Sequence, residues 1–244
     1  NTCVAPQHEM VDVYATPEYW DQRYVESLER PEGEDRGAVF DWLAHPIEDS
    51  ELFSRWLSFL PRKKDDCVLE VGCGNSVLAE ELVKHGHRHV VAVDFSEVST
   101  RAMAERAREQ GLEAHLTYIA ADVLALPLRS ASVGAVLDKG CLDALLNAHD
   151  QYMWWQSCGS RGECKYDWER SKRQAREMLR EVRRVLAPAA SADAVAFLLI
   201  SYSSPPGRLP FLEEAGFAVT AEEDDKGNWV YVCRGQGDNA GSCT

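Results

Sequence analysis

Short apolar runs alternate with amphipathic segments along most of the chain. The pattern starts at "CVLEV", where Cys67 opens an apolar run that is followed by helical spacing over residues 77–85. An alternation of this kind is typical of a parallel sheet with helices on both faces. The remaining runs predict strands within 89–95, 115–123, 133–140, 194–202, 216–223 and 228–235, and helices within 38–60, 96–110, 168–188 and 209–215.

The last two apolar runs are separated only by the tight turn "DDKGN", Asp224 to Asn228. A connection this short permits only antiparallel pairing. We therefore predict an α/β fold, a three-layer sandwich whose seven-strand sheet is mostly parallel and has an antiparallel last strand. Ligands of such sheets bind beyond the carboxyl ends of the strands.

Composition narrows the class of partner. The 244 residues suit one compact domain, and the formal net charge of −14 disfavours nucleic acid as the main partner. No stretch reaches the roughly 20 apolar residues that cross a bilayer, so no membrane association is expected.

The eight cysteines are scattered without a CxxC pair, which favours a reducing compartment and predicts no metal site. We expect an intracellular protein, cytoplasmic or mitochondrial, and a removed targeting segment stays open because the chain begins at Asn1.

The stretch "VLEVGCGNS" places two glycines directly after the first predicted strand. Gly72 and Gly74 allow backbone N–H groups to approach a ligand beside a helix start, although glycine also makes ordinary turns. A dinucleotide fingerprint needs a third glycine where Val77 stands. Glu70 would repel phosphates and favour a cation, and S-adenosylmethionine carries both a sulfonium and an ammonium group.

Carboxylates also follow the next two strands. Asp94 ends the second strand, about twenty residues beyond the glycine turn, where a carboxylate can accept both ribose hydroxyls. Asp122, with Val123 beside it, follows the third strand and is placed to accept from an adenine amino group. Each acid alone has a simpler interpretation as a solvated strand end. Together with the glycine turn they indicate an adenosine-bearing cofactor.

At this point the motifs resemble a known family. "VLEVGCGNS", "VVAVDFS", "AADVLALP" and "VLDKGCLDALL" are similar to the successive motifs of class I, seven-β-strand S-adenosylmethionine-dependent methyltransferases, over about residues 17–234. The resemblance implies a Rossmann-like fold and S-adenosylmethionine as cofactor, with S-adenosylhomocysteine as product. "DKGCLDALL" looks like the DKGTxDA signature of the branch with the elongation factor 1A and citrate synthase lysine methyltransferases. The chain departs from it at Cys141, where threonine is usual, and in an insert at about 149–170.

The resemblance also implies roles for individual residues. Those around the glycine turn line the methionine end, those after the second and third strands hold ribose and adenine, and an amino-terminal segment folds over the cofactor. The cofactor-binding residues implied are Trp20, Arg23, Tyr24, Glu70, Gly72, Gly74, Asn75, Asp94, Phe95, Asp122, Val123 and Asp138.

Methyl transfer to lysine requires a neutral amine, and the ordinary lysine pKa of about 10.4 leaves little of it at neutral pH. A desolvated channel lowers this pKa, and a carboxylate can place the amine or collect its proton. Asp138 and Asp143 are our candidate catalytic acids; for Asp143, a helix cap is an equal alternative. In the insert, Trp154, Trp155 and Trp168 either pack onto the domain or form a binding surface.

We therefore expect a protein-lysine methyltransferase whose acidic surface suits a basic, lysine-bearing target face, of the elongation factor 1A or citrate synthase type. A small-molecule methyltransferase of the same fold and a non-catalytic cofactor-binding partner protein are the alternatives. The expected organisation is a lid segment at 1–36, a methyltransferase domain at 37–235 and a flexible tail at 236–244.

Overall fold

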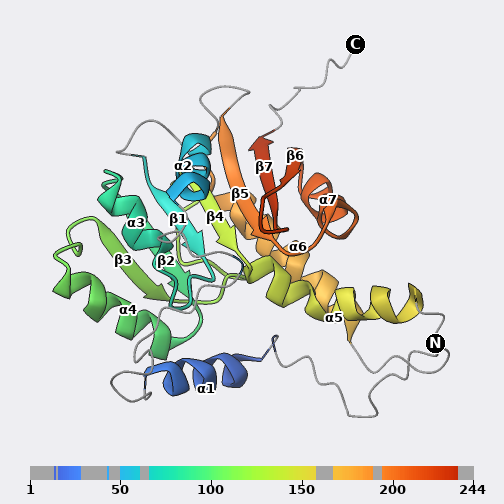
Figure 1. Ribbon diagram of the computed structural model, residues 1–244, viewed down its shortest axis with the longest axis horizontal. Coiled ribbons are helices and arrows are strands. Elements are labelled where there is room, and N and C mark those ends of the chain that lie inside the picture. The colour runs from blue at the N-terminus through green and yellow to red at the C-terminus, as the bar shows by residue number, and fades with distance from the viewer. Residues whose placement is uncertain are drawn as a thin grey trace.

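The computed structural model describes residues 14, 16–28, 43, 50–60, 66–157, 167–188 and 194–235. Within them a single seven-stranded sheet has the order β3-β2-β1-β4-β5-β7-β6 (Figure 1). Its strands are β1 (Val68–Val71), β2 (Val90–Asp94), β3 (Leu116–Ala120), β4 (Ala135–Lys139), β5 (Val195–Ser201), β6 (Phe217–Glu223) and β7 (Trp229–Gly235).

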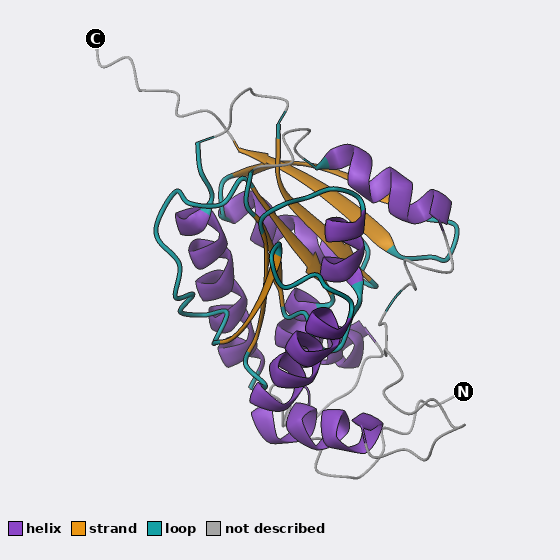
Figure 2. Ribbon diagram, turned by 90° about the vertical axis from the view of Figure 1, so that its left-hand side faces the viewer, coloured by secondary structure: helices purple, strands orange, loops and turns teal. Residues whose placement is uncertain are grey.

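Helices cover both faces of this sheet (Figure 2). They are α1 (Pro17–Leu28), α2 (Ser50–Phe59), α3 (Leu78–Lys84), α4 (Glu97–Glu109), α5 (Cys141–Ser157), α6 (Trp168–Val185) and α7 (Pro205–Glu214). The predicted three-layer α/β architecture is thereby confirmed. Helix α7 begins four residues before the sequence-based prediction, because Pro205 and Pro206 occupy the first helical positions, where a missing N–H is not needed.

Strand direction also follows the prediction. The pairs β1–β2, β1–β4, β2–β3 and β4–β5 are parallel, and β7 pairs antiparallel with both β5 and β6. The turn before β7 is closed by the N–H of Asp224, which donates to the carbonyl of Asn228 at 2.7 Å. The last strand in sequence is therefore not at the edge, since it lies between β5 and β6.

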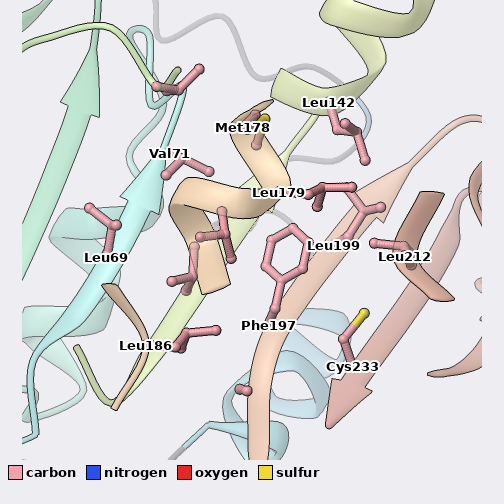
Figure 3. Packing of buried hydrophobic residues seen from close by; sticks show 14 of the residues in the cluster. Leu69, Val71, Leu142, Met178, Leu179, Leu186, Phe197, Leu199, Leu212 and Cys233 are labelled. Atoms are coloured by element: carbon pink, nitrogen blue, oxygen red, sulfur yellow. The ribbon is translucent and has the colours of Figure 1, made fainter. Parts of the chain in front are cut away.

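Two apolar cores hold the layers together. One lies between the sheet and helices α5, α6 and α7, and includes Phe197, Met178 and Leu212 (Figure 3). The other lies between the opposite face and helices α2, α3 and α4, and includes Trp56 and Leu82. The buried positions of α6 recur every three or four residues, so the charged helix predicted at 168–188 has one apolar stripe that faces the sheet.

The carboxyl ends of the parallel strands all lie on one side of the molecule, and α1 and the start of α5 lie along it (Figure 1). We call this side the carboxyl edge, or this edge, of the sheet. Among the described residues, no helix is long and apolar enough to cross a membrane.

The first core gives a test of the fold. Phe197 is fully buried at its centre, so we expect Phe197→Ala to lower the free energy of unfolding by about 3–5 kcal/mol through lost burial and a residual cavity. Thr117→Ala, on the exposed side of β3, should change it by less than about 0.5 kcal/mol. Urea unfolding followed by circular dichroism measures both, and equal effects would contradict this assignment of the core.

Candidate active site

The glycine turn after β1 is enclosed by two helices. Gly72 and Gly74 have φ angles of 61° and 50°, in the left-handed region that favours glycine. A Cβ atom on Gly72 would lie 2.6 Å from the Sγ atom of Cys141, and one on Gly74 would lie 2.5 Å from the phenol oxygen of Tyr24. The turn therefore needs glycine because the start of α5 and the lid helix α1 both approach its backbone.

Asp94 joins this turn to the end of β2. Its carboxylate is buried and accepts from the N–H groups of Gly74 and Ser96, each at 2.9 Å. Burial raises the pKa of Asp94 to about 6, although these two backbone hydrogen bonds act in the opposite direction. The Ser96 hydroxyl caps α4 and donates to Asp21 of α1 at 2.5 Å. One carboxylate thus connects β1, β2 and α4, and through Ser96 the lid.

The lid residues predicted from the sequence lie over the turn. Trp20 and Tyr24 are buried and stack with their ring centroids 6.0 Å apart. Burial, followed by the charge of Asp94, raises the pKa of Tyr24. Arg23 is half-buried, and its charge acts in the opposite direction on the pKa values of Tyr14 and Tyr24, so it lies near both phenols.

The residues predicted to hold ribose and adenine are neighbours. The N–H of Ala121 donates to the carbonyl of Asp94 at 2.9 Å, which brings the segment after β3 beside the end of β2. Asp122 is exposed and accepts from the N–H of Leu124 at 2.8 Å, while Val123 is buried. Phe95 is 38% exposed. An exposed aromatic ring and two carboxylates are thus found at, or just after, the ends of β2 and β3.

Glu70 lies within β1, two residues before Gly72. Its register partners, Ala92 and Leu137, both belong to the core beneath α2, α3 and α4, and register partners share a face of the sheet. Glu70 is buried on that face and raises the pKa of Tyr118 there, after burial and Cys73. The role of Glu70 at the methionine end of the cofactor stays a prediction.

Asn75 is half-buried within the turn. The hydroxyl of the adjacent Ser76 accepts from the N–H of Leu78, the first residue of α3, at 3.2 Å.

Asp138 caps α5. It is fully buried at the end of β4, and its carboxylate accepts from the N–H groups of Cys141 at 2.7 Å and Leu142 at 2.9 Å. Burial, then the nearby charge of Asp143, raises the pKa of Asp138 to about 7. A group with this pKa exchanges protons near neutral pH, which suits acid–base work.

Asp143 does not cap the helix, so this alternative is wrong. It lies in the first turn of α5 and accepts from the Ser201 hydroxyl at 2.5 Å, the Tyr202 N–H at 3.0 Å and the Arg208 Nε at 2.9 Å. The side chain therefore connects α5 to the end of β5 and to α7. The adjacent Lys139 is buried in β4.

The predicted insert is partly regular structure. Its first residues, 149–157, continue α5, and Trp168 begins α6. The Nζ atom of Lys172 lies 4.4 Å from the Trp168 ring centroid, so this tryptophan makes a cation–π contact within α6. The side chains of Trp154 and Trp155, and both Cys158 and Cys164, lie outside the described residues. In the described part of the chain, no three His, Cys, Asp or Glu side chains are grouped to hold a metal ion.

Three residues of this edge, Arg208, Asp150 and Tyr202, were not predicted from the sequence. Arg208 is fully buried and pairs with Asp143 at 2.9 Å and with Asp150 at 2.8 Å. Tyr202 donates its phenol proton to Asp150 at 2.8 Å. Tyr202 follows directly after β5, so the rule that polar residues gather beyond strand ends applied to it. Arg208 stands in "SSPPGRLP", which contains no comparable signal.

Comparison with known proteins identifies the family. Residues 68–158 match the family model described as a methyltransferase domain. EEF1A lysine methyltransferase 4 of Bos taurus is 31% identical over 232 residues, which cover 93% of this chain and 78% of that protein. The chain belongs to the class I S-adenosylmethionine-dependent methyltransferases. The eEF1A lysine and N-terminal methyltransferase of Mus musculus is 30% identical over 139 residues, and this match spans only 18% of that longer protein.

Solved structures of methyltransferases have the same fold. A SAM-dependent methyltransferase from Aquifex aeolicus aligns with 88% of this chain and 98% of its own, with a TM-score of 0.54 and 18% identity. Geranyl diphosphate C-methyltransferase from Streptomyces coelicolor A3(2), solved with S-adenosyl-L-homocysteine, aligns with 91% of this chain and 100% of its own, with a TM-score of 0.55 and 14% identity.

S-adenosylmethionine is therefore the cofactor, and the chemistry of the edge fits it. Asp94 uses each oxygen for one backbone N–H, and a carboxylate has about four acceptor positions. Lone pairs thus remain for hydroxyl donors such as those of a ribose. Phe95 offers a partly exposed aromatic ring after β2, and Asp122 offers an exposed carboxylate after β3.

The close approach of the lid gives a test with a matched control. Gly74→Ala would place a Cβ atom against Tyr24, whereas Gly86→Ala, at φ 95°, would meet nothing within 4 Å. Each should lose about 1 kcal/mol of stability from its positive φ. Only Gly74→Ala should also displace the lid and weaken S-adenosylmethionine binding in calorimetry; equal binding by the two variants would contradict the enclosure of the turn.

The raised pKa of Asp138 predicts a pH-dependent stability. An acid whose pKa rises on folding adds stability below its unfolded pKa near 4, and this is lost as pH rises through the folded value of about 7. Asn can still cap α5 but has no such proton. From pH 4 to 7 the stability of Asp138→Asn should therefore gain on that of the wild type, by an order of 1 kcal/mol or more.

Chemical denaturation at several pH values measures this difference. Asp225→Asn, an exposed carboxylate in the β6–β7 turn, serves as the control and should show a nearly constant difference from the wild type. A constant difference for Asp138→Asn as well would rule out the raised pKa.

Proposed function

We propose that this protein transfers the methyl group of S-adenosylmethionine to a lysine side chain of elongation factor 1A. The observation that carries the proposal is the 31% identity with EEF1A lysine methyltransferase 4, which extends over 93% of the chain. The formal charge of −14 supports it, because an acidic surface attracts a target with a basic, lysine-bearing face and repels nucleic acid.

The same proposal assigns the cofactor contacts. Asp94 binds the ribose hydroxyls, Phe95 flanks the adenine, and Asp122 with Val123 holds the adenine edge. Backbone groups of the glycine turn, with Asn75, hold the methionine end. The lid supplies Trp20 and Tyr24 as a cover that excludes water, and Arg23 pairs with the methionine carboxylate. Support comes from the buried position of Asp94 against the turn and from the lid that lies over it.

The cofactor supplies an activated methyl group, so the chain mainly has to align the acceptor amine and exclude water. Asp138 lies beside the turn through Cys141, and its pKa of about 7 suits a group that receives the proton of the lysine ammonium. Asp143 is a positioning residue in this proposal, because its carboxylate is engaged by Ser201, Tyr202 and Arg208.

Transfer of radiolabelled methyl to elongation factor 1A produced in bacteria, followed by mass spectrometry of the product, tests the function. We expect label on lysine, and we expect Asp94→Ala to bind S-adenosylmethionine about 10–100-fold more weakly, since it loses hydrogen bonds to a charged acceptor. Glu113→Gln, an exposed carboxylate before β3 at the opposite edge of the sheet, is the control. Cofactor binding by a wild type that labels no lysine would overturn the proposal.

A further inference from the structure

Tyr202 is an exposed aromatic residue on a tightly held backbone. It is 49% exposed directly after β5, and its N–H donates to Asp143 at 3.0 Å. The following residue is also held, because the Tyr231 hydroxyl donates to the carbonyl of Ser203 at 2.6 Å. At the other end of the ring, the phenol donates to Asp150 at 2.8 Å. The ring is therefore fixed in one orientation at the surface.

A buried cation supports this arrangement from below. Arg208 contacts the carboxylates of Asp143 and Asp150, and its guanidinium carbon lies 5.5 Å from the Tyr202 ring centroid. Burial alone would raise the pKa of Asp150. Hydrogen bonds with His149, Arg208 and Tyr202 and the charge of Arg208 outweigh burial, so the pKa of Asp150 is lowered. Asp150 is thus ionised at neutral pH, and the Arg208 guanidinium lies between two carboxylates.

This cluster lies next to the end of β4, which leads into the start of α5. Lys139 of β4 is in register with Ile200 of β5, and the N–H of Gly140 donates to the carbonyl of Ile200 at 3.2 Å. Cys141 follows immediately and packs against Gly72 of the cofactor turn. Tyr202 directly follows β5, and β4 separates β5 from β1, the strand that leads into that turn (Figure 1). Its hydrogen bonds to Asp143 and Asp150 place it beside α5.

An exposed apolar side chain stands one helical turn from Asp150 on α5. Met153 is 51% exposed and stands three residues after Asp150 on α5, so both lie on one side of the helix. We call Tyr202, Asp150 and Met153 together the basic-residue surface, a name that refers to the basic side chain it would bind and not to its own residues. An aromatic face, a flexible apolar side chain and an ionised carboxylate match the two parts of a lysine or arginine side chain, its apolar stem and its cationic head.

We propose that the basic-residue surface binds a lysine or arginine that neighbours the acceptor lysine in the target protein, with Arg208 as its positioning residue. This inference rests on the proposed function. The bound residue is not the acceptor itself, because an ionised Asp150 stabilises a protonated amine, and a protonated amine has no lone pair to receive a methyl group. The acceptor lysine instead reaches the region of Asp138 and Cys141.

Steady-state kinetics with bacterially produced elongation factor 1A, at saturating S-adenosylmethionine, test the proposal. Tyr202→Ala should raise the KM for the acceptor protein about tenfold, with kcat within about twofold of the wild type. Tyr202→Phe retains the ring and should raise KM about two- to threefold; Met153→Ala should act in the same direction. The control Glu113→Gln should leave both constants unchanged, and calorimetry with S-adenosylhomocysteine should give one affinity for all five proteins.

Each other outcome has a distinct meaning. Active transfer with an unchanged KM in Tyr202→Ala would overturn this inference and leave the proposed function intact. A joint loss of kcat and of S-adenosylhomocysteine affinity would also overturn it, because Tyr202 would then only hold α5 in place. A wild type that binds S-adenosylhomocysteine but methylates no lysine of elongation factor 1A would overturn the proposed function, and this inference with it.

Discussion

The buried carboxylate of Asp94 holds the cofactor side of the molecule together. It accepts from Gly74 in the turn after β1 and from Ser96 at the start of α4, and Ser96 in turn donates to Asp21 of the lid helix. Elements distant in sequence thus converge on one side chain that is itself a strand end. Because the parallel strands all end on the same side of the sheet, a short polar residue at the end of β2 can contact the turn and α4 directly, and α1 through Ser96.

A second contact joins the glycine turn to the ends of β4 and β5. Cys141 lies against Gly72, and the helix that it begins is capped by Asp138. Farther along the first turn, Asp143 ties the same helix to β5 and α7. The start of α5 is therefore fixed relative to both the glycine turn and the end of β5. Such rigid support matters for methyl transfer, where alignment of the acceptor with the methyl group provides much of the rate enhancement.

The sequence allowed the layers, the strand directions and the glycine turn to be predicted, because each depends on local periodicity or on one residue type at a strand end. It did not allow the position of β7 inside the sheet, since strand order depends on which edges meet in space. The roles of Asp138 and Asp143 were equally hidden. Both residues precede or begin a helix, and only the three-dimensional contacts reveal that Asp138 is the cap and that Arg208, 65 residues after Asp143, is its partner.

Asp94, Asp138 and Asp150 are the same residue type, but their different surroundings shift their pKa values in different directions. Asp94 and Asp138 are buried against backbone N–H groups that only partly offset desolvation, so their pKa values rise. Asp150 has a guanidinium and a phenol as donors, and its pKa falls. An acid with a pKa near 7 can exchange a proton with an amine, whereas an acid with a lowered pKa is ionised at neutral pH and attracts a cation. In the proposed function, this difference between Asp138 and Asp150 separates a place where the acceptor lysine loses its proton from a place where a neighbouring basic side chain keeps its charge.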